Sequence, residues 1–133
     1  MSVFRAPSIN IYTHDVPRLV AFYEGLGFRE TFRTPKVGEP AHIELMLGGF
    51  TLGVAAVKAA ASDHRLSPNL EGHSVEVVLW TDDVDLAHSR LTGSGSPSLS
   101  PPHDFLSNLR AAWVSDPDGN PIQLVQRRAA SHL

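Results

Sequence analysis

The stretch Asp116-Pro117-Asp118-Gly119-Asn120-Pro121-Ile122-Gln123-Leu124 decides how the rest of the sequence is interpreted. Its first Asp and Pro favour the start of a turn, and the glycine and asparagine that follow tolerate positive φ. Ile122 and Leu124 then alternate with Gln123, which is the period of a strand. The stretch therefore predicts a tight turn that leads into a strand with one apolar face.

The composition fits one soluble globular domain. A chain of 133 residues is long enough to bury a single core. The net charge of -3 offers no basic surface, so we expect no nucleic-acid partner. Because cysteine is absent, disulfides, thiolate nucleophiles and cysteine-bound zinc are excluded. The sequence has no signal-peptide pattern and no apolar run of membrane-spanning length, so we expect a cytoplasmic protein with no membrane partner.

The first half of the sequence predicts one strand, one helix and three further strands. Asp15 can cap the helix, Pro17 suits its first turn, and Gly25 and Gly27 end it. The predicted strands, from their alternation, cover residues 8–12, 28–34, 42–47 and 50–54.

The second half repeats this order after a connector. Residues 58–74 show no sustained period, and we interpret them as a connector with a short helix at its start. A strand over 75–80 and a helix capped at Asp83 follow. The serines and prolines of residues 94–107 predict a long loop, which is either a lid or simply a connection. A further strand then leads to the final turn.

The two halves share an internal repeat. Pairs of like residues lie 68 positions apart: Asp15 and Asp83, Gly25 and Gly93, Gly27 and Gly95. At the far end the offset is 70, from Gly49 to Gly119. We expect a two-residue insertion within 94–107 to explain the difference. The predicted fold is α+β, with two βαβββ modules over about 5–57 and 74–127, joined by the connector 58–73 in one domain of residues 1–133.

The repeated pattern resembles the vicinal oxygen chelate superfamily, which includes glyoxalase I, extradiol dioxygenases and bleomycin-resistance proteins. The stretches that carry the resemblance are residues 15–18, 22–23, 26–28, 82–85 and 116–124. The resemblance implies that the two modules form a curved cup for a small molecule, within one chain or across a dimer. We accordingly expect a small-molecule partner and a homodimer.

The resemblance also implies positions for metal ligands. Metal-dependent members carry ligands at positions that correspond here to Ser8, Gly53, Glu76 and Gln123. Only Glu76 is a strong donor, so we expect no standard metal site and no cofactor. His42 and Glu44 on the third strand are candidates for a displaced site. The other candidate histidines, which we interpret as solvated loop or tail residues, are His14, His73, His103 and His132.

Strand parity predicts which side chains face the cup. The predicted ligand-binding residues are Asn10, Tyr12, His42, Glu44, Trp80, Trp113 and Gln123, with Val78 and Ala111 on the same faces. Two tryptophans and a tyrosine would form an aromatic wall able to stack on a flat ligand. Alternatively, the tryptophans fill the core or a dimer interface.

Glu76 is the candidate catalytic residue, with two interpretations. It either pairs with an arginine such as Arg110, or it lies unpaired in an apolar cup and acts as a general base. Our first functional hypothesis is a metal-independent protein that binds an aromatic or amphipathic molecule. The alternative is an enzyme, either a metal-dependent lyase or dioxygenase with a displaced site, or a metal-free catalyst that uses Glu76. In a third and weaker hypothesis, partner side chains fill the cup.

Overall fold

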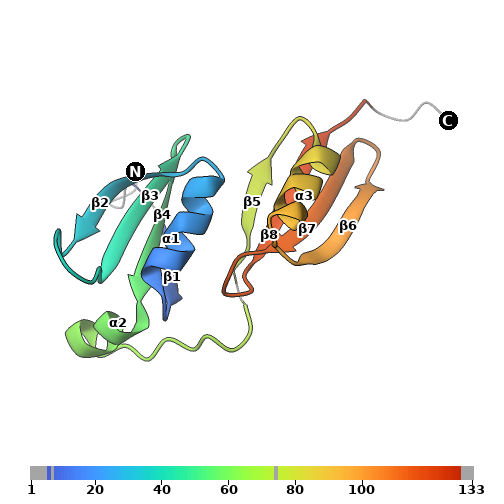
Figure 1. Cartoon of the computed structure of the whole chain (residues 1–133). Coiled ribbons are helices and arrows are strands. Elements are labelled where there is room, and N and C mark those ends of the chain that lie inside the picture. The colour runs from blue at the N-terminus through green and yellow to red at the C-terminus, as the bar shows by residue number, and fades with distance from the viewer. Residues whose placement is uncertain (1–5, 7, 74, 130–133) are drawn as a thin grey trace, which may run out of the picture. The chain divides into compact units, whose positions relative to one another are not determined.

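The computed structural model describes residues 6, 8–73 and 75–129. They form two compact units, the first ending at Gly72 and the second beginning at His73 (Figure 1). Each unit holds one four-stranded mixed sheet and its own helices, so the predicted α+β class is confirmed. No helix in the described part of the chain is both long and apolar enough to cross a membrane.

The first unit contains four strands and two helices. In chain order they are β1 (Ile9–Thr13), α1 (Val16–Gly25), β2 (Arg29–Thr34), β3 (His42–Leu47), β4 (Phe50–Ala56) and α2 (Val57–His64). The strand order in the sheet is β1-β4-β3-β2, with β1 parallel to β4 and the other pairs antiparallel. Helix α2 confirms the short helix predicted at the start of the connector.

The second unit repeats this arrangement. Its elements are β5 (Val77–Trp80), α3 (Val84–Gly93), β6 (Ser98–Phe105), β7 (Leu109–Ser115) and β8 (Pro121–Arg127). The strand order is β5-β8-β7-β6, and β5 runs parallel to β8. In Figure 1 one helix covers one face of each sheet, α1 in the first unit and α3 in the second. The opposite face of each sheet is called its open face below.

Alternating apolar residues build a separate core in each unit. In the first unit, Leu45, Leu52 and Val54 are fully buried against α1, which contributes Leu19 and Tyr23. In the second unit the equivalent residues are Val77, Val84, Ala112, Val114, Ile122 and Leu124. Burying this apolar surface is the main stabilising term, and it leaves the other strand face available for polar and aromatic side chains.

Helices α1 and α3 begin with the same capping arrangement. The Asp15 carboxylate accepts a hydrogen bond from the backbone N–H of Arg18 at 3.1 Å, and the Asp83 carboxylate accepts one from Leu86 at 3.0 Å. A threonine two residues before each cap accepts a bond from the N–H of the capping aspartate. Both predicted caps are thus confirmed, and each satisfies a backbone donor that the helix leaves unpaired.

The predicted loop over residues 94–107 is wrong, because most of it forms strand β6. The two prolines of β6, Pro101 and Pro102, lack the N–H that a central strand needs. Strand β6 lies at the edge of the sheet and pairs only with β7, and the pairing shifts register twice, between Ser98 and Ser100 and between Ser100 and His103. Edge position and bulges are two of the settings in which a strand tolerates proline.

Strand pairing also corrects the predicted insertion. Asn10 pairs with Gly53 and Val78 pairs with Gln123, which confirms offsets of 68 and 70 for these strands. On β3 and β7, however, the equivalent residues Glu44 and Trp113 are offset by 69 positions in the sequence. The pairings of β2 and β6 place one extra residue in β6, within 94–107 as predicted. The other lies in the turn before β8, outside that range.

The turn before β8 is organised by Asp116, whose exposed fraction is only 2%. Its carboxylate accepts hydrogen bonds from the N–H groups of Asp118 and Asn120, at 2.9 and 2.8 Å, and from the Asn120 side-chain amide at 2.7 Å. Gly119 has a φ of +88°, a conformation that strongly favours glycine. The predicted turn is confirmed.

Candidate functional site

The open face of the second sheet brings together aromatic and polar side chains from all four strands. Strand pairing aligns Val78, Gln123 and Trp113 in one row across the sheet. The next row contains Trp80, Val125, Ala111 and His103. Both tryptophans of the chain therefore lie on one face, as strand parity predicts. We refer to this surface as the aromatic face.

Trp113 is held in place by two neighbours. Its indole Nε1–H donates a hydrogen bond to Glu76 Oε2 at 3.1 Å. The His103 ring stacks beside it, with ring centroids 5.9 Å apart and planes inclined by 19°. Trp113 is half-buried, so it is not part of the apolar core on the α3 side of the sheet. Its position fixes an aromatic surface at the centre of β7.

Trp80 is exposed over 57% of its surface, which is unusual for so large an apolar side chain. The guanidinium carbon of Arg127 lies 4.8 Å from the centre of its ring, a cation–π contact. Two strand spacings, about 10 Å, separate the columns of Trp80 and Trp113. The short side chains of Val125 and Ala111 lie between them and are buried. Within its own unit, Trp80 does not fill the core.

Glu76 directly precedes β5 and is exposed. The predicted pairing with Arg110 is wrong, because Arg110 lies on the α3 side of β7 and binds Asp85 and Asp104 instead. Glu76 is exposed and paired, so it does not lie unpaired in an apolar cup as its predicted role as a general base requires. Its observed contact is with Trp113, so the structure gives it a role in orienting that ring.

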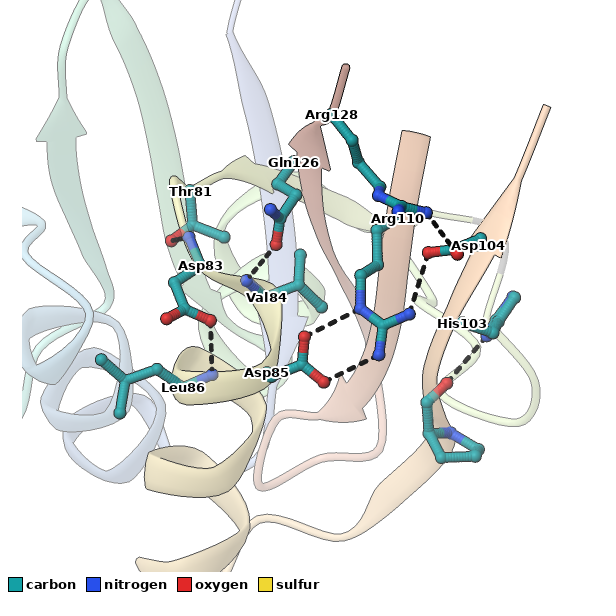
Figure 2. A network of polar contacts seen from close by, with 11 residues as sticks. Thr81, Asp83, Val84, Asp85, Leu86, His103, Asp104, Arg110, Gln126 and Arg128 are labelled. Carbon is teal, nitrogen blue, oxygen red and sulfur yellow. Dashed lines mark hydrogen bonds and ion pairs between the residues drawn. The ribbon is translucent and has the colours of Figure 1, made fainter. Parts of the chain in front are cut away.

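Arg110, on β7, is the centre of an ion-pair network that connects α3 to strands β6 and β7 of the second sheet (Figure 2). Its Nε and one terminal nitrogen each lie 2.8 Å from the Asp85 carboxylate, and the other terminal nitrogen lies 2.9 Å from Asp104. Asp104 also pairs with Arg128. Hydrogen bonds donated by Arg110 hold the pKa of both carboxyls below the usual range. The bonds that Arg110 makes to Asp85 and then to Asp104 raise its own pKa.

The open face of the first sheet has a different character. Glu44 and Asn10 both pair with Gly53, from opposite sides of β4. A Cβ atom at Gly53 would lie 2.0 Å from Asn10 Oδ1 and 3.0 Å from His42 Cε1, so these two side chains converge above the glycine. His42 Nε2 lies 3.4 Å from Glu44 Oε2. Tyr12 is half-buried two residues from Asn10, on the same face.

The residues at the positions implied for metal ligands do not fit a metal centre. Gly53 supplies no donor, and the amide of Asn10 occupies the space where a side chain at that position would start. Ser8 is exposed, and Glu76 is bound to Trp113. Across the described residues, no three His, Asp or Glu side chains gather closely enough to hold a metal ion.

The other histidines have separate surroundings. His73 Nδ1 lies 3.0 Å from Asn120 Oδ1, so His73 braces the final turn rather than being only solvated. His14 is exposed, as predicted for a loop histidine. His132 lies outside the described residues.

Two residues of the aromatic face were missed by the sequence interpretation. His103 lies in the segment that the sequence predicts to be a loop, because the prolines and bulges of β6 interrupt the alternation of a strand. Arg127 is absent from the predicted site, although it follows Gln123 and Val125 at a strand period of two, which is a usable signal.

The fold defines an α+β protein of two βαβββ modules of the glyoxalase/bleomycin-resistance type. The model of the Glyoxalase/Bleomycin resistance protein/Dioxygenase superfamily matches residues 5–124, so the chain belongs to that superfamily. No curated protein matches the sequence significantly.

Solved structures with the same fold cover almost the whole chain. Hypothetical protein SA1046 from S. aureus is 20% identical, with a TM-score of 0.77, over 94% of this chain and 95% of that one. TioX from Micromonospora sp. ML1 is 25% identical, with a TM-score of 0.72, over 92% and 99%. Lactoylglutathione lyase from Agrobacterium tumefaciens is 16% identical, with a TM-score of 0.70, over 94% and 96%.

Proposed function

We propose that this protein binds a small, flat aromatic molecule on the aromatic face of its second module, without a metal ion. The observation that carries the proposal is the pair of tryptophans on one open sheet face, neither of which serves the core of its module. Large exposed apolar side chains that lie close together mark binding surfaces more often than isolated ones do.

The surroundings of Trp113 favour binding because they fix the ring before a ligand arrives. The bond to Glu76 and the contact with His103 restrict its rotation. A ligand that stacks on a fixed ring loses less conformational entropy on binding. Gln123, next to Trp113 on β8, adds an amide able to donate and accept hydrogen bonds.

Trp80 and Arg127 extend the surface on its other side. The guanidinium restrains the Trp80 ring and adds a positive charge beside it. This combination suits an amphipathic ligand whose aromatic part carries a polar or anionic group. Aromatic stacking combined with a few polar contacts is the usual composition of a small-molecule site.

Tryptophan substitutions test this proposal, with 7-hydroxycoumarin as the probe. We expect Trp113→Ala to weaken its binding about tenfold, and Trp80→Ala to act in the same direction, because each removes a stacking surface. Isothermal titration calorimetry measures the affinities. Phe50→Ala, which removes an exposed aromatic ring from the first unit, should leave binding unchanged and is the matched control. Equal affinity in all four proteins, or no binding by the wild type, would contradict the proposal.

A second candidate function is metal-free proton transfer on the first sheet. The convergence of Asn10 and His42 above Gly53, with Glu44 beside His42, places a titratable ring next to a carboxylate and an amide. Lactoylglutathione, after which one structural relative is named, is a suitable first substrate. If this function holds, His42→Gln slows the consumption of lactoylglutathione at least tenfold. Glu76→Gln, which replaces the other candidate base, leaves the rate of consumption unchanged. Equal rates in both variants and the wild type would rule out His42.

A further inference from the structure

His103 has a fixed hydrogen-bonding state on the aromatic face. Its Nδ1 lies 2.7 Å from the carbonyl oxygen of Pro101, a contact drawn in Figure 2. A carbonyl oxygen only accepts hydrogen bonds, so Nδ1 must carry the hydrogen. In the neutral imidazole, Nε2 then holds a lone pair and acts as an acceptor.

The local structure of β6 produces this state. The bulge between Ser100 and His103 contains Pro101 and Pro102, and it turns the Pro101 carbonyl back toward the ring two residues later. Among the described residues, no hydrogen-bond partner reaches Nε2, and His103 is exposed. The acceptor is therefore available to a molecule that approaches the aromatic face.

The ring geometry places the His103 imidazole in a layer nearly parallel to the Trp113 ring. The His103 and Trp113 planes are nearly parallel, with centroids 5.9 Å apart. For rings in contact at about 3.5 to 4 Å, this distance corresponds to a sideways displacement of about 4.5 Å. His103 therefore covers only part of Trp113. A flat ligand stacked on the remainder would lie beside the imidazole, in nearly the same layer.

We propose that His103 Nε2 accepts a hydrogen bond from the bound ligand, so that the aromatic face selects flat aromatic molecules with an in-plane donor. A phenolic hydroxyl and a ring N–H are donors of this kind, because their hydrogen lies in the plane of the ring, as the imidazole lone pair does. This inference rests on the proposed function and names the chemical class of its ligand.

Two probes with the same ring system isolate the hydrogen bond. 7-Hydroxycoumarin has the donor, and 7-methoxycoumarin replaces the hydrogen with a methyl group. We expect the wild type at neutral pH to bind the hydroxyl compound five- to tenfold more tightly in calorimetric titrations, the range of one hydrogen bond at a partly exposed site. His103→Phe keeps an aromatic ring beside Trp113 and removes the acceptor. It should abolish the preference, so that the variant binds the two coumarins with equal affinity.

His88→Phe is the matched control. His88 lies on α3, and its side chain binds Ser98 at 2.8 Å, away from the aromatic face. This variant should keep the wild-type preference. Because one variant is expected to lose the preference and the other to keep it, a general effect of replacing histidine is separated from loss of the acceptor.

The outcomes separate this inference from the function on which it rests. If the wild type binds both coumarins equally, or if His103→Phe keeps the preference, the inference is wrong and the binding function stands. If the wild type binds neither, both fail. Should His103→Phe not fold, long-range ¹H–¹⁵N spectra of the wild type decide the question. The Nε2 signal of His103 must move with 7-hydroxycoumarin and stay in place with 7-methoxycoumarin, and any other pattern overturns the inference.

Discussion

Asp116 shows how one buried side chain can specify a whole turn. Its carboxylate accepts three hydrogen bonds from Asp118 and Asn120, and the Asn120 amide is then braced by His73. A glycine is favoured at this position by its positive φ, and a Cβ added at Gly119 would lie 3.2 Å from His73 Nε2. The turn places Gln123 on the aromatic face, because it sets where β8 begins.

Asp116→Ala should lower the free energy of unfolding by about 3 kcal/mol, since it leaves three N–H donors without their charged acceptor. Urea denaturation followed by circular dichroism measures the change. Asp82→Ala, at an exposed aspartate beside a helix cap, is the control and should change stability by less than about 0.5 kcal/mol. Similar small changes in both variants would contradict the role given to Asp116.

At the scale of elements, strand β6 has two structural roles that its sequence does not predict. As an edge strand with two bulges it accommodates Pro101 and Pro102, and its Asp104 joins the ion-pair network around Arg110. On its opposite face it presents His103 next to Trp113. One irregular strand thus fastens α3 to the sheet and supplies the acceptor of the proposed site.

The network around Arg110 predicts a pH dependence of stability. The pKa values of Asp85 and Asp104 are depressed in the folded state, first of all by hydrogen bonds from Arg110. A depressed carboxyl pKa stabilises the fold above the unfolded value, and that contribution is lost as the pH falls through the folded value. Arg110→Met should therefore lower the urea midpoint near pH 7, and the difference from wild type should shrink between about pH 4 and pH 2.

Arg29→Met provides the comparison for this experiment. Arg29 is exposed on β2, and no described residue forms an ion pair with it. The urea midpoint of the Arg29→Met variant should equal that of the wild type at every pH. A difference between Arg110→Met and wild type that stays constant down to pH 2 would show that Arg110 acts through packing of its side-chain stem rather than through the carboxylates.

At the scale of the whole molecule, two modules with one topology carry different chemistry at equivalent positions. Glu44 corresponds to Trp113, and Gly53 corresponds to Gln123. The first module therefore presents a histidine, a carboxylate and an amide, while the second presents an aromatic surface. An aromatic ligand therefore suits the second module, and proton transfer suits the first.

The sequence by itself determined the parts of this protein that depend on short-range signals. Caps at Asp15 and Asp83, glycine turns and alternating apolar residues are local, and they predicted most helices and strands and the repeated βαβββ topology. The sequence did not predict strand β6, because proline opposes strand formation locally. Only the edge position of β6 in the sheet makes its prolines acceptable.

Contacts between distant strands were decided only by the tertiary structure. Glu76 and Trp113 lie 37 residues apart, and their hydrogen bond depends on the pairing of β5, β8 and β7. The neighbours of Arg110 and the acceptor state of His103 likewise depend on strand register and on bulges. A shift of one residue reverses the face of every side chain on a strand, so these contacts follow from the assembled sheet and not from any one segment.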